Sequence, residues 1–325
     1  MLIPSVSNTR KTLIIYIDIR DEQGVQTNEV GLIKSSAVRG AEGSGNQVDW
    51  TVSTFIPINS GGVLCPIDWI HLSQTIRTSV NNLDIDSVMV MHPFDSLAYS
   101  AAALSFHLSG LPATVIFCDV AHVLFSTDDE YLKTMAQALV ANQQQRPWGV
   151  YVFSVDEFIP ATRCSLMETC DDKRRFVRRT NESTFKVPLF IGHFDNAQFA
   201  RPTSVAVLPI FPGYNEKHVE CSLNCGVNAL VLEFTSVRII DFFTDELFRV
   251  LRSAYESQVV VVAITQFYEP GLYDADNCFM DAGVISGADM TREAVYGKLH
   301  VLLATELSFE KVRQLVGQNL IGEMT

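Results

Sequence analysis

A hydrophobic run long enough to cross a membrane as a helix is lacking from this sequence. The longest apolar runs, such as Val259 to Ile264, fall far short of the roughly 20 residues that a bilayer requires. Residues 1–11 also lack the apolar core of a secretory signal peptide. We therefore expect no membrane partner and a cytoplasmic location, with an organellar presequence left open.

Positive charge is also scarce. The chain has 325 residues, with 24 Lys and Arg against 37 Asp and Glu, and a formal net charge of −13. Such an acidic protein repels phosphate backbones, so we expect no nucleic-acid partner. The local exception is a basic cluster at residues 173–179. We interpret it as a solvated loop, with a docking site for an acidic partner as the alternative.

Motifs for metals, disulfides and nucleotides are lacking as well. The seven cysteines are odd in number and irregularly spaced, which does not suit a disulfide framework. Cys221 and Cys225 could form half of a zinc site, but no second pair of ligands follows, so we interpret them as ordinary thiols. The sequence has neither a G-x-S-x-G elbow nor a P-loop lysine motif, and the glycine-rich residues 40–45 are interpreted as a loop. We expect no metal ion and no cofactor.

The sequence does contain short apolar runs that alternate with helical patterns. This order predicts an α/β fold in which a mostly parallel sheet is covered on both faces. The expected strands are residues 13–17, 87–91, 114–118, 150–153, 205–210, 229–233 and 259–264, and the expected helices are 66–80, 96–108, 128–141 and 244–257, with two more after Thr291 and Ser308.

The chain is expected to form two domains. We predict a larger N-terminal α/β domain at residues 1–190, a linker at 191–204 and a smaller C-terminal α/β domain at 205–325. The C-terminal domain begins where a strand pattern starts, just after Ser204. Thr244 is expected to cap the helix that follows it, because a threonine side chain can accept a hydrogen bond from a free helical N–H.

Several blocks of the sequence resemble one enzyme family. Residues 90–106, VMHPFDSLAYSAAALSF, resemble the second active-site motif V-V-x-H-G-T-D-T-M-A-Y-T-A-A-A-L-S-F of the cytosolic-type (type I) L-asparaginases. Further co-linear blocks are PIDW at 66–69, LPATVIF at 111–117, DAGVISGADMT at 281–291 and QNLIGEMT at 318–325. The resemblance implies an asparaginase-like two-domain fold and assembly into a dimer.

The first active-site motif of that family has lost its chemistry here. In the family, a T-G-G-T-I loop follows the first strand and carries the nucleophilic threonine. The corresponding residues here are Ile17, Asp18, Ile19 and Arg20, so Ile17 stands at the nucleophile and Arg20 at the second threonine. None of these side chains carries a hydroxyl that could attack a carbonyl.

The second motif is only half retained. Phe94 stands at the family's threonine, while Asp95 and Ser96 remain as remnants of the substrate-binding part. The family's lysine, in an R-G-N-R-A-T-K segment, corresponds to Leu166. Asp95 has two open roles. It could hold a substrate ammonium, or it could cap a helix that begins near Ser96.

These losses favour a protein without catalytic residues. The leading hypothesis is an inactive asparaginase-like protein that acts as a structural, scaffold or regulatory subunit, as a homodimer, as a heterodimer with a related chain or within a larger complex. The alternative is a residual L-asparaginase or amidohydrolase that releases ammonia from Asn or a related amide, using Asp95 with Ser96, Tyr16, Tyr99 or His92. A third hypothesis is a small-molecule sensor.

Overall fold

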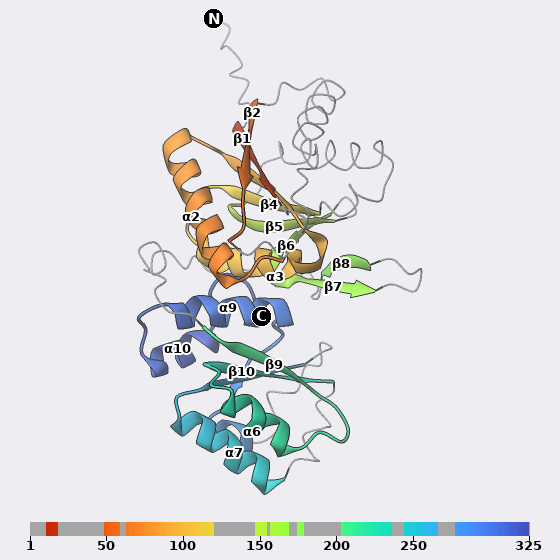
Figure 1. Ribbon diagram of the computed structural model, residues 1–325, viewed down its shortest axis with the longest axis vertical. Helices are drawn as coiled ribbons and strands as arrows, with labels where there is room; N and C mark the ends of the chain where they lie inside the picture. The colour runs from red at the N-terminus through yellow and green to blue at the C-terminus, as the bar shows by residue number, and fades with distance from the viewer. Residues whose placement is uncertain are drawn as a thin grey trace, which may run out of the picture. The chain divides into compact units, whose positions relative to one another are not determined.

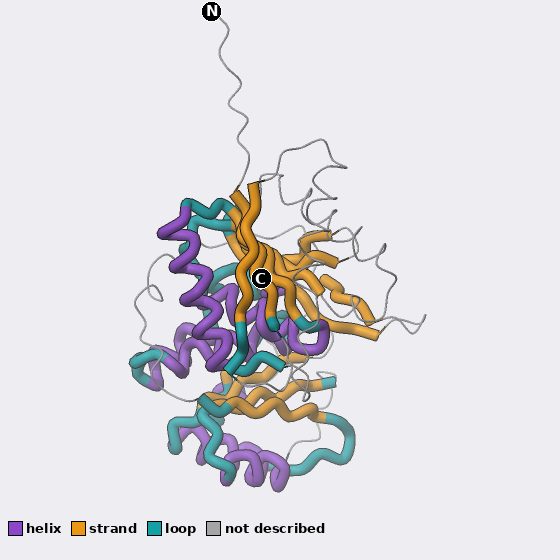
Figure 2. Tube along the Cα trace, turned by 45° about the horizontal axis from the view of Figure 1, so that its top comes forward, coloured by secondary structure: helices purple, strands orange, loops and turns teal. Residues whose placement is uncertain are grey.

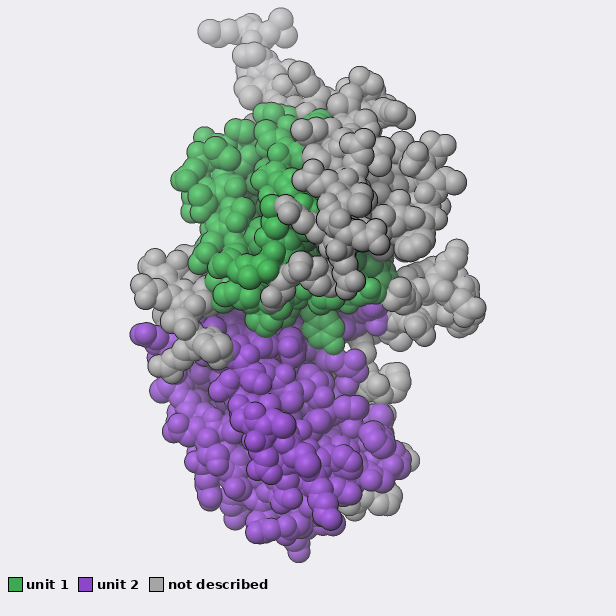
Figure 3. All heavy atoms as spheres, in the orientation of Figure 1, with its two compact units in different colours: residues 1–101, 110–160 green, residues 102–109, 161–325 purple. Residues whose placement is uncertain are grey.

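The computed structural model describes residues 11–18, 49–58, 63–119, 147–154, 157–168, 174–178, 203–235, 244–265 and 277–324. The chain forms two compact units (Figure 3). Unit 1 comprises residues 1–101 and 110–160, and unit 2 comprises residues 102–109 and 161–325. Figure 2 distinguishes the helices of the chain from its strands.

The sheet of unit 1 has six strands in the order β2-β1-β3-β4-β5-β6. Neighbours from β2 to β5 are parallel, and β6 is antiparallel to β5. All four expected strands are confirmed. The strands are β1 (Lys11–Ile17), β2 (Asp49–Phe55), β3 (Ser87–His92), β4 (Thr114–Asp119), β5 (Gly149–Ser154) and β6 (Glu157–Pro160).

The strands at the centre of this sheet are buried on both faces. Every residue of β3 is buried, as are six of the seven residues of β1. One face carries a cluster that includes Ile14, Tyr16, Met89 and Met91. Burial on both faces explains why these strands are continuous apolar runs in the sequence, without the alternation of a half-exposed sheet.

The described part of unit 1 also contains helix α2 (Pro66–Leu83) and residues 94–101 of helix α3, whose remaining residues belong to unit 2. Helix α2 begins with proline, whose missing N–H costs nothing in the first turn. It buries Trp69, Leu72, Ile76 and Val80, which recur at helical spacing. Helix α3 spans Phe94–His107, so it begins two residues before the expected start at Ser96.

The sheet of unit 2 has four parallel strands in the order β12-β11-β10-β9. Helices α6 and α7 contribute to the core on one face, and helices α9 and α10 contribute to the core on the other (Figure 1). The strands are β9 (Val205–Ile210), β10 (Ala229–Phe234), β11 (Val260–Thr265) and β12 (Ile285–Ser286), and the helices are α6 (Glu216–Asn224), α7 (Asp245–Glu256), α8 (Asn277–Asp281), α9 (Arg292–Ala304) and α10 (Phe309–Val316).

The expected helix starts in unit 2 are confirmed. The side chains of Thr244, Thr291 and Ser308 each accept a hydrogen bond from the backbone N–H three residues later, at 3.3, 3.0 and 3.4 Å. This geometry satisfies one of the N–H groups that the first turn of a helix leaves without a partner.

Unit 2 also contains a short 3-10 helix, η1 (Ala161–Arg163), and an antiparallel pair of strands. The strands are β7 (Cys164–Glu168) and β8 (Arg174–Arg178). The interpretation of the basic cluster as a loop is therefore wrong over residues 174–178. The cluster forms a strand there because each of its residues pairs with β7, and its middle residue, Phe176, is buried.

Some expectations fall outside the described residues. These are the helix at 128–141, the glycine-rich loop at 40–45 and nearly all of the linker at 191–204. The boundary between the expected domains, 1–190 and 205–325, therefore stays a prediction. No helix in the described part of the chain combines the length and the apolar character needed to cross a membrane.

Candidate functional site

The candidate site in unit 1 is the edge at which the parallel strands β1, β3 and β4 end. Tyr16 pairs with Met91, and His92 pairs with Asp119, so the last residues of all three strands lie in neighbouring rows. Ligands of open α/β sheets bind at the carboxyl ends of such strands. Ile17 is the last residue of β1, and Phe94 follows the end of β3 by two residues. These are the two positions at which the family's nucleophilic threonines are expected.

Ile17 is the last residue of β1 and is fully buried. It pairs with Phe55 of β2, and the next N–H, that of Asp18, donates to the carbonyl of Phe55 at 2.9 Å. The backbone at Ile17 therefore still pairs with β2 as part of the regular sheet. Ile19 and Arg20, which complete the degenerate first motif, lie outside the described residues.

Phe94 and Asp95 form the start of α3. The Phe94 side chain is buried, whereas Asp95 is exposed in the first helical turn. The helix begins at Phe94, so Asp95 stands within its first turn, and the two open roles of Asp95 stay predictions. A carboxylate in the first turn is still favourable, since the N-terminal end of a helix carries partial positive charge.

Ser96 follows with its side chain only 6% exposed. Its hydroxyl oxygen has no hydrogen-bond partner among the described residues. A buried hydroxyl without a partner costs free energy. The structure therefore places the two remnant residues differently: Asp95 is exposed to solvent, and Ser96 is enclosed.

His92 is buried at the end of β3. Its Nδ1 donates to the carbonyl of Pro93 at 2.8 Å, so Nε2 is the unprotonated nitrogen, and Nε2 has no partner within the described ranges. Burial lowers the pKa of His92 to about 4, against a smaller opposing effect of the hydrogen bond to Pro93. The ring centroid of His92 lies 5.6 Å from that of Phe117. His92 is therefore neutral at pH 7, as expected for a structural histidine.

Leu166, at the position of the family's lysine, belongs to unit 2. It lies on β7, half-buried, and pairs across the two strands with Phe176 of β8. An apolar cross-strand pair stabilises a sheet by burying both side chains. The position is thus occupied by a packing residue, which has no group able to accept or donate a proton.

The residues just before Leu166 are held by a buried polar network that no local pattern in the sequence indicated. Arg163 forms an ion pair with Asp289 at 2.8 Å, with both side chains nearly inaccessible, and its Nε donates to the carbonyl of Gly322 at 2.7 Å. Ser165 donates to Glu293 at 2.8 Å. Asp289 and Gly322 lie in the two C-terminal blocks that matched the family motifs best, which was the available signal for this network.

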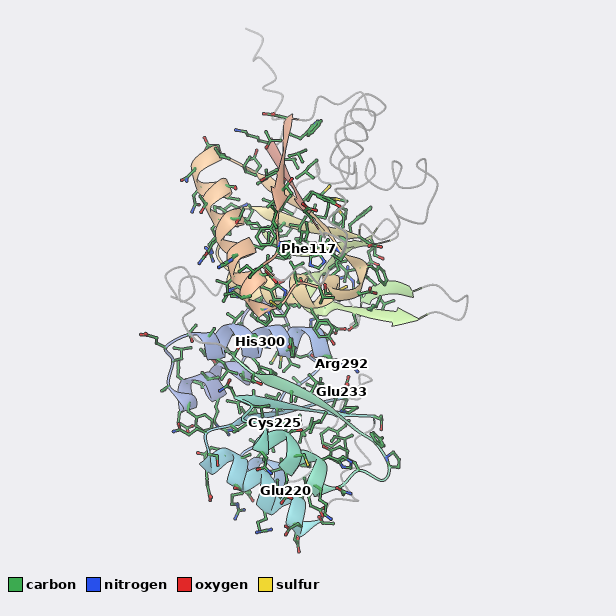
Figure 4. All side chains as sticks on the ribbon, viewed as in Figure 1. Phe117, Glu220, Cys225, Glu233, Arg292 and His300 are labelled. Carbon is green, nitrogen blue, oxygen red and sulfur yellow. The ribbon has the colours of Figure 1, made fainter. Side chains whose placement is uncertain are left out.

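Another buried carboxylate lies at the carboxyl end of β10. Glu233 accepts a hydrogen bond from Nε of Arg292, at the start of α9, at 2.9 Å (Figure 4). The Glu233 side chain is 3% exposed and that of Arg292 is 38% exposed. The sequence pattern identified Glu233 only as the last residue of the expected strand 229–233, and did not indicate its pairing with Arg292. Among the described residues, no group of three or more His, Cys, Asp or Glu side chains could hold a metal ion.

Family models match most of the chain. Residues 20–176 match the N-terminal asparaginase domain, and residues 204–316 match the glutaminase/asparaginase C-terminal domain. L-asparaginase 1 of Escherichia coli (strain K12) is 29% identical over 304 residues, which cover 85% of each chain.

Two other kinds of relative are also similar. The 60 kDa lysophospholipase of Homo sapiens is 28% identical over 320 residues, which cover 91% of this chain and 54% of that protein. A glutamyl-tRNA(Gln) amidotransferase subunit of Methanobrevibacter smithii is 24% identical over 282 residues, which cover 79% of this chain and 63% of that one.

Solved structures show the same fold. L-asparaginase I from Vibrio cholerae superposes with a TM-score of 0.76 at 24% identity, covering 98% of this chain and all of that one. The thermostable L-asparaginase from Thermococcus kodakarensis gives a TM-score of 0.69 at 20% identity, covering 97% and 99%. The two matched domains and the shared two-domain α/β fold identify this chain as a member of the asparaginase family.

Proposed function

We propose that this chain is a catalytically inactive member of the asparaginase family and serves as a structural, scaffold or regulatory subunit of an assembly. The observation that carries the proposal is the replacement of both expected nucleophiles by buried apolar side chains, Ile17 and Phe94. A hydrolase that loses its nucleophile loses activity by a factor on the order of 10⁶. Leu166, at the position of the lysine, adds no base.

The proposed partner is a second copy of this chain or a related chain, in a dimer or a larger complex. One of the relatives is named as a subunit of an enzyme, a glutamyl-tRNA(Gln) amidotransferase. Members of the family therefore include chains that work as part of an assembly. We propose the same for this chain, with a cytoplasmic location, in keeping with its resemblance to the cytosolic-type enzymes.

A residual amidohydrolase is the second candidate, and two observations favour it. Asp95 is exposed at the carboxyl edge of the sheet, and the hydroxyl of Ser96 is not engaged by any described residue. Both belong to the part of the second motif that the family resemblance links to substrate binding. Such an enzyme would release ammonia from Asn or a related amide.

An ammonia-release assay separates the two candidates. The purified full chain is incubated with Asn and with Gln, beside the Asp95→Ala variant and a blank without protein. The proposal expects all three to release ammonia at the same rate. Release by the full chain that disappears in Asp95→Ala would establish the residual enzyme. Purification from native cells, followed by mass spectrometry, would then identify the stoichiometric partner that the scaffold role requires.

A further inference from the structure

A pair of thiols lies near the C-terminal end of α6 in unit 2. Cys221 is in the last turns of the helix, and Cys225 is its C-cap, with the helical backbone angles φ −76° and ψ −3°. The N–H of Cys225 donates to the carbonyl of Cys221 at 3.2 Å, which is the hydrogen bond of one α-helical turn. Side chains four residues apart on a helix lie on the same face, so both thiols point the same way.

That face is the solvent side of the helix. The buried side of α6 is set by Val219, with Leu223 packed beside it against the core of unit 2. Cys221 and Cys225 fall on the opposite side, and both are free and exposed, whereas Cys118 and Cys164 are buried. Figure 4 shows Cys225 labelled in unit 2. A solute can therefore reach both sulfur atoms at once.

The expected distance between the Cβ atoms of Cys221 and Cys225 does not suit a disulfide. Neighbouring Cβ atoms on a helix face are roughly 5–6 Å apart. The two Cβ atoms of an unstrained disulfide are about 3.8 Å apart. A metal ion between the two sulfur atoms can bridge this longer Cβ–Cβ distance, because each bond from sulfur to a metal such as zinc is about 2.3 Å long. The pair is set for a bridging ion rather than for direct oxidation.

We propose that Cys221 and Cys225 form a two-thiolate site for a soft metal ion, Cu(I). Thiolate ligands select soft ions, and the described residues offer no third His, Cys, Asp or Glu that converges with these two, which disfavours the four-ligand sites of zinc. On binding, each thiol releases its proton to water as its sulfur bonds the ion, and no electron is transferred. The site is independent of the proposed function and of the sheet edge in unit 1.

The overall charge of the protein favours binding of a cation. On α6 itself, Glu216 and Glu220 are accompanied by Lys217, which is exposed four residues before Cys221. The formal net charge of −13 adds a general attraction for positive ions.

The test is a titration of the reduced full chain with Cu(I), supplied under anaerobic conditions as its acetonitrile complex. The number of copper equivalents retained after desalting against bicinchoninate is measured. We expect the wild type to retain one equivalent more than Cys221→Ser, Cys225→Ser and the double variant, with all three variants equal. Equal retention by the wild type and the three variants would overturn the proposal.

A matched control keeps the number of thiols and changes only their geometry. Ser222→Cys combined with Cys225→Ser places the two thiols at adjacent positions, about 100° apart around the helix. This variant is expected to lose the extra equivalent, whereas Cys65→Ser, a thiol on another element, is expected to keep it. A rearranged pair that retains the equivalent would contradict the site.

A second measurement uses the unaltered chain and does not depend on how any variant folds. The protein is alkylated with iodoacetamide with and without one equivalent of Cu(I), and the modified cysteines are mapped by mass spectrometry. We expect Cu(I) to protect Cys221 and Cys225 together. Protection of other cysteines alone would place the ion elsewhere and overturn the assignment.

Discussion

The ammonium group of Lys298 lies 2.6 Å from a carboxylate oxygen of Glu323, and neither side chain is exposed. Lys298 also donates to the carbonyls of Val316 and Gln318, at 2.9 and 2.5 Å. Glu323 accepts hydrogen bonds from the backbone N–H groups of Leu320 and Ile321. The pair thus joins α9 to the C-terminal segment of the chain.

Removing one partner of this pair is expected to destabilise the protein strongly. Burial lowers the pKa of Lys298, although the attraction of Glu323 opposes that shift. Glu323→Leu leaves the buried ammonium without its counter-charge, and such a change costs about 3–5 kcal/mol of unfolding free energy. Chemical denaturation of the wild type and the variant measures the difference.

The control for this prediction is the double variant Lys298→Met with Glu323→Leu. It removes both charges together, so it is expected to be more stable than Glu323→Leu alone. A double variant as unstable as the sum of the two single variants would show that the two side chains do not interact energetically.

Much of the fold was predictable from the sequence because buried parallel strands have a simple signature. The continuous apolar runs at Leu13, Val88 and Val115 mark strands that are covered on both faces. The caps Thr244, Thr291 and Ser308 were predictable for the same local reason, since they need only the next turn of chain.

The parts that were missed depend on residues far apart in the sequence. Arg163 contacts Asp289, 126 residues later, and Ser165 contacts Glu293, 128 residues later. No local pattern marks such pairs. Residues 174–178 carry arginines around one buried phenylalanine and form a strand only because β7 provides a partner, whereas charge alone suggested a loop.

The candidate site was predictable in its positions but not in its exposure. The family motifs identified Ile17, Phe94, Asp95 and Ser96 as positions of the expected site. The motifs alone did not indicate that Asp95 is exposed while Ser96 is enclosed. The helix α3 begins at Phe94, so Asp95 stands within its first turn.

His92 is expected to make the stability of the protein depend on pH between about 4 and 6.5. Its pKa in the folded protein is about 4, below the ordinary value of 6.5. Within this window the unfolded chain binds a proton that the folded chain does not, so stability rises with pH from 4 to 6.5 and is lost as the pH falls. The contribution is about 3 kcal/mol, at roughly 1.4 kcal/mol per pKa unit.

The measurement compares the unfolding free energy of the wild type and His92→Leu at several pH values. The difference between the two proteins isolates the histidine from the carboxylates that titrate in the same range. We expect His92→Leu to lose less stability than the wild type between pH 6.5 and pH 4. Parallel curves would mean that His92 does not titrate as proposed.

Gly297 on α9 is expected to tolerate no side chain. A Cβ atom at this position would lie 2.8 Å from the Cα and the N of Ala103, which are backbone atoms within the same unit. Backbone atoms cannot rotate away as a side chain can, so Gly297→Ala forces α9 away from Ala103 of α3. Overpacking of this kind costs about 1–3 kcal/mol, more than alanine gains over glycine in helix propensity.

Gly317→Ala is the matched control for that prediction. A Cβ atom at Gly317 would lie 3.4 Å from a methyl group of Ile285, which is near an ordinary contact distance. Thermal unfolding should therefore show a much larger fall in Tm for Gly297→Ala than for Gly317→Ala. Equal effects of the two substitutions would count against close packing of α9 on Ala103.

Restoring the lost hydroxyl groups at the edge of the unit 1 sheet is expected to destabilise the protein without creating activity. Ile17 is fully buried and Phe94 is 8% exposed, so threonine at either position removes apolar surface from the core and introduces a polar group. Each full side chain contributes about 1.5–3 kcal/mol by burial. The paired variant Ile17→Thr with Phe94→Thr should unfold at lower denaturant concentration than the wild type.

The same paired variant should release no ammonia from Asn, because Leu166 still provides no base where the family has a lysine. Turnover in the paired variant that Asp95→Ala abolishes would show that the rest of the site is intact and that the two substitutions alone account for an inactive chain.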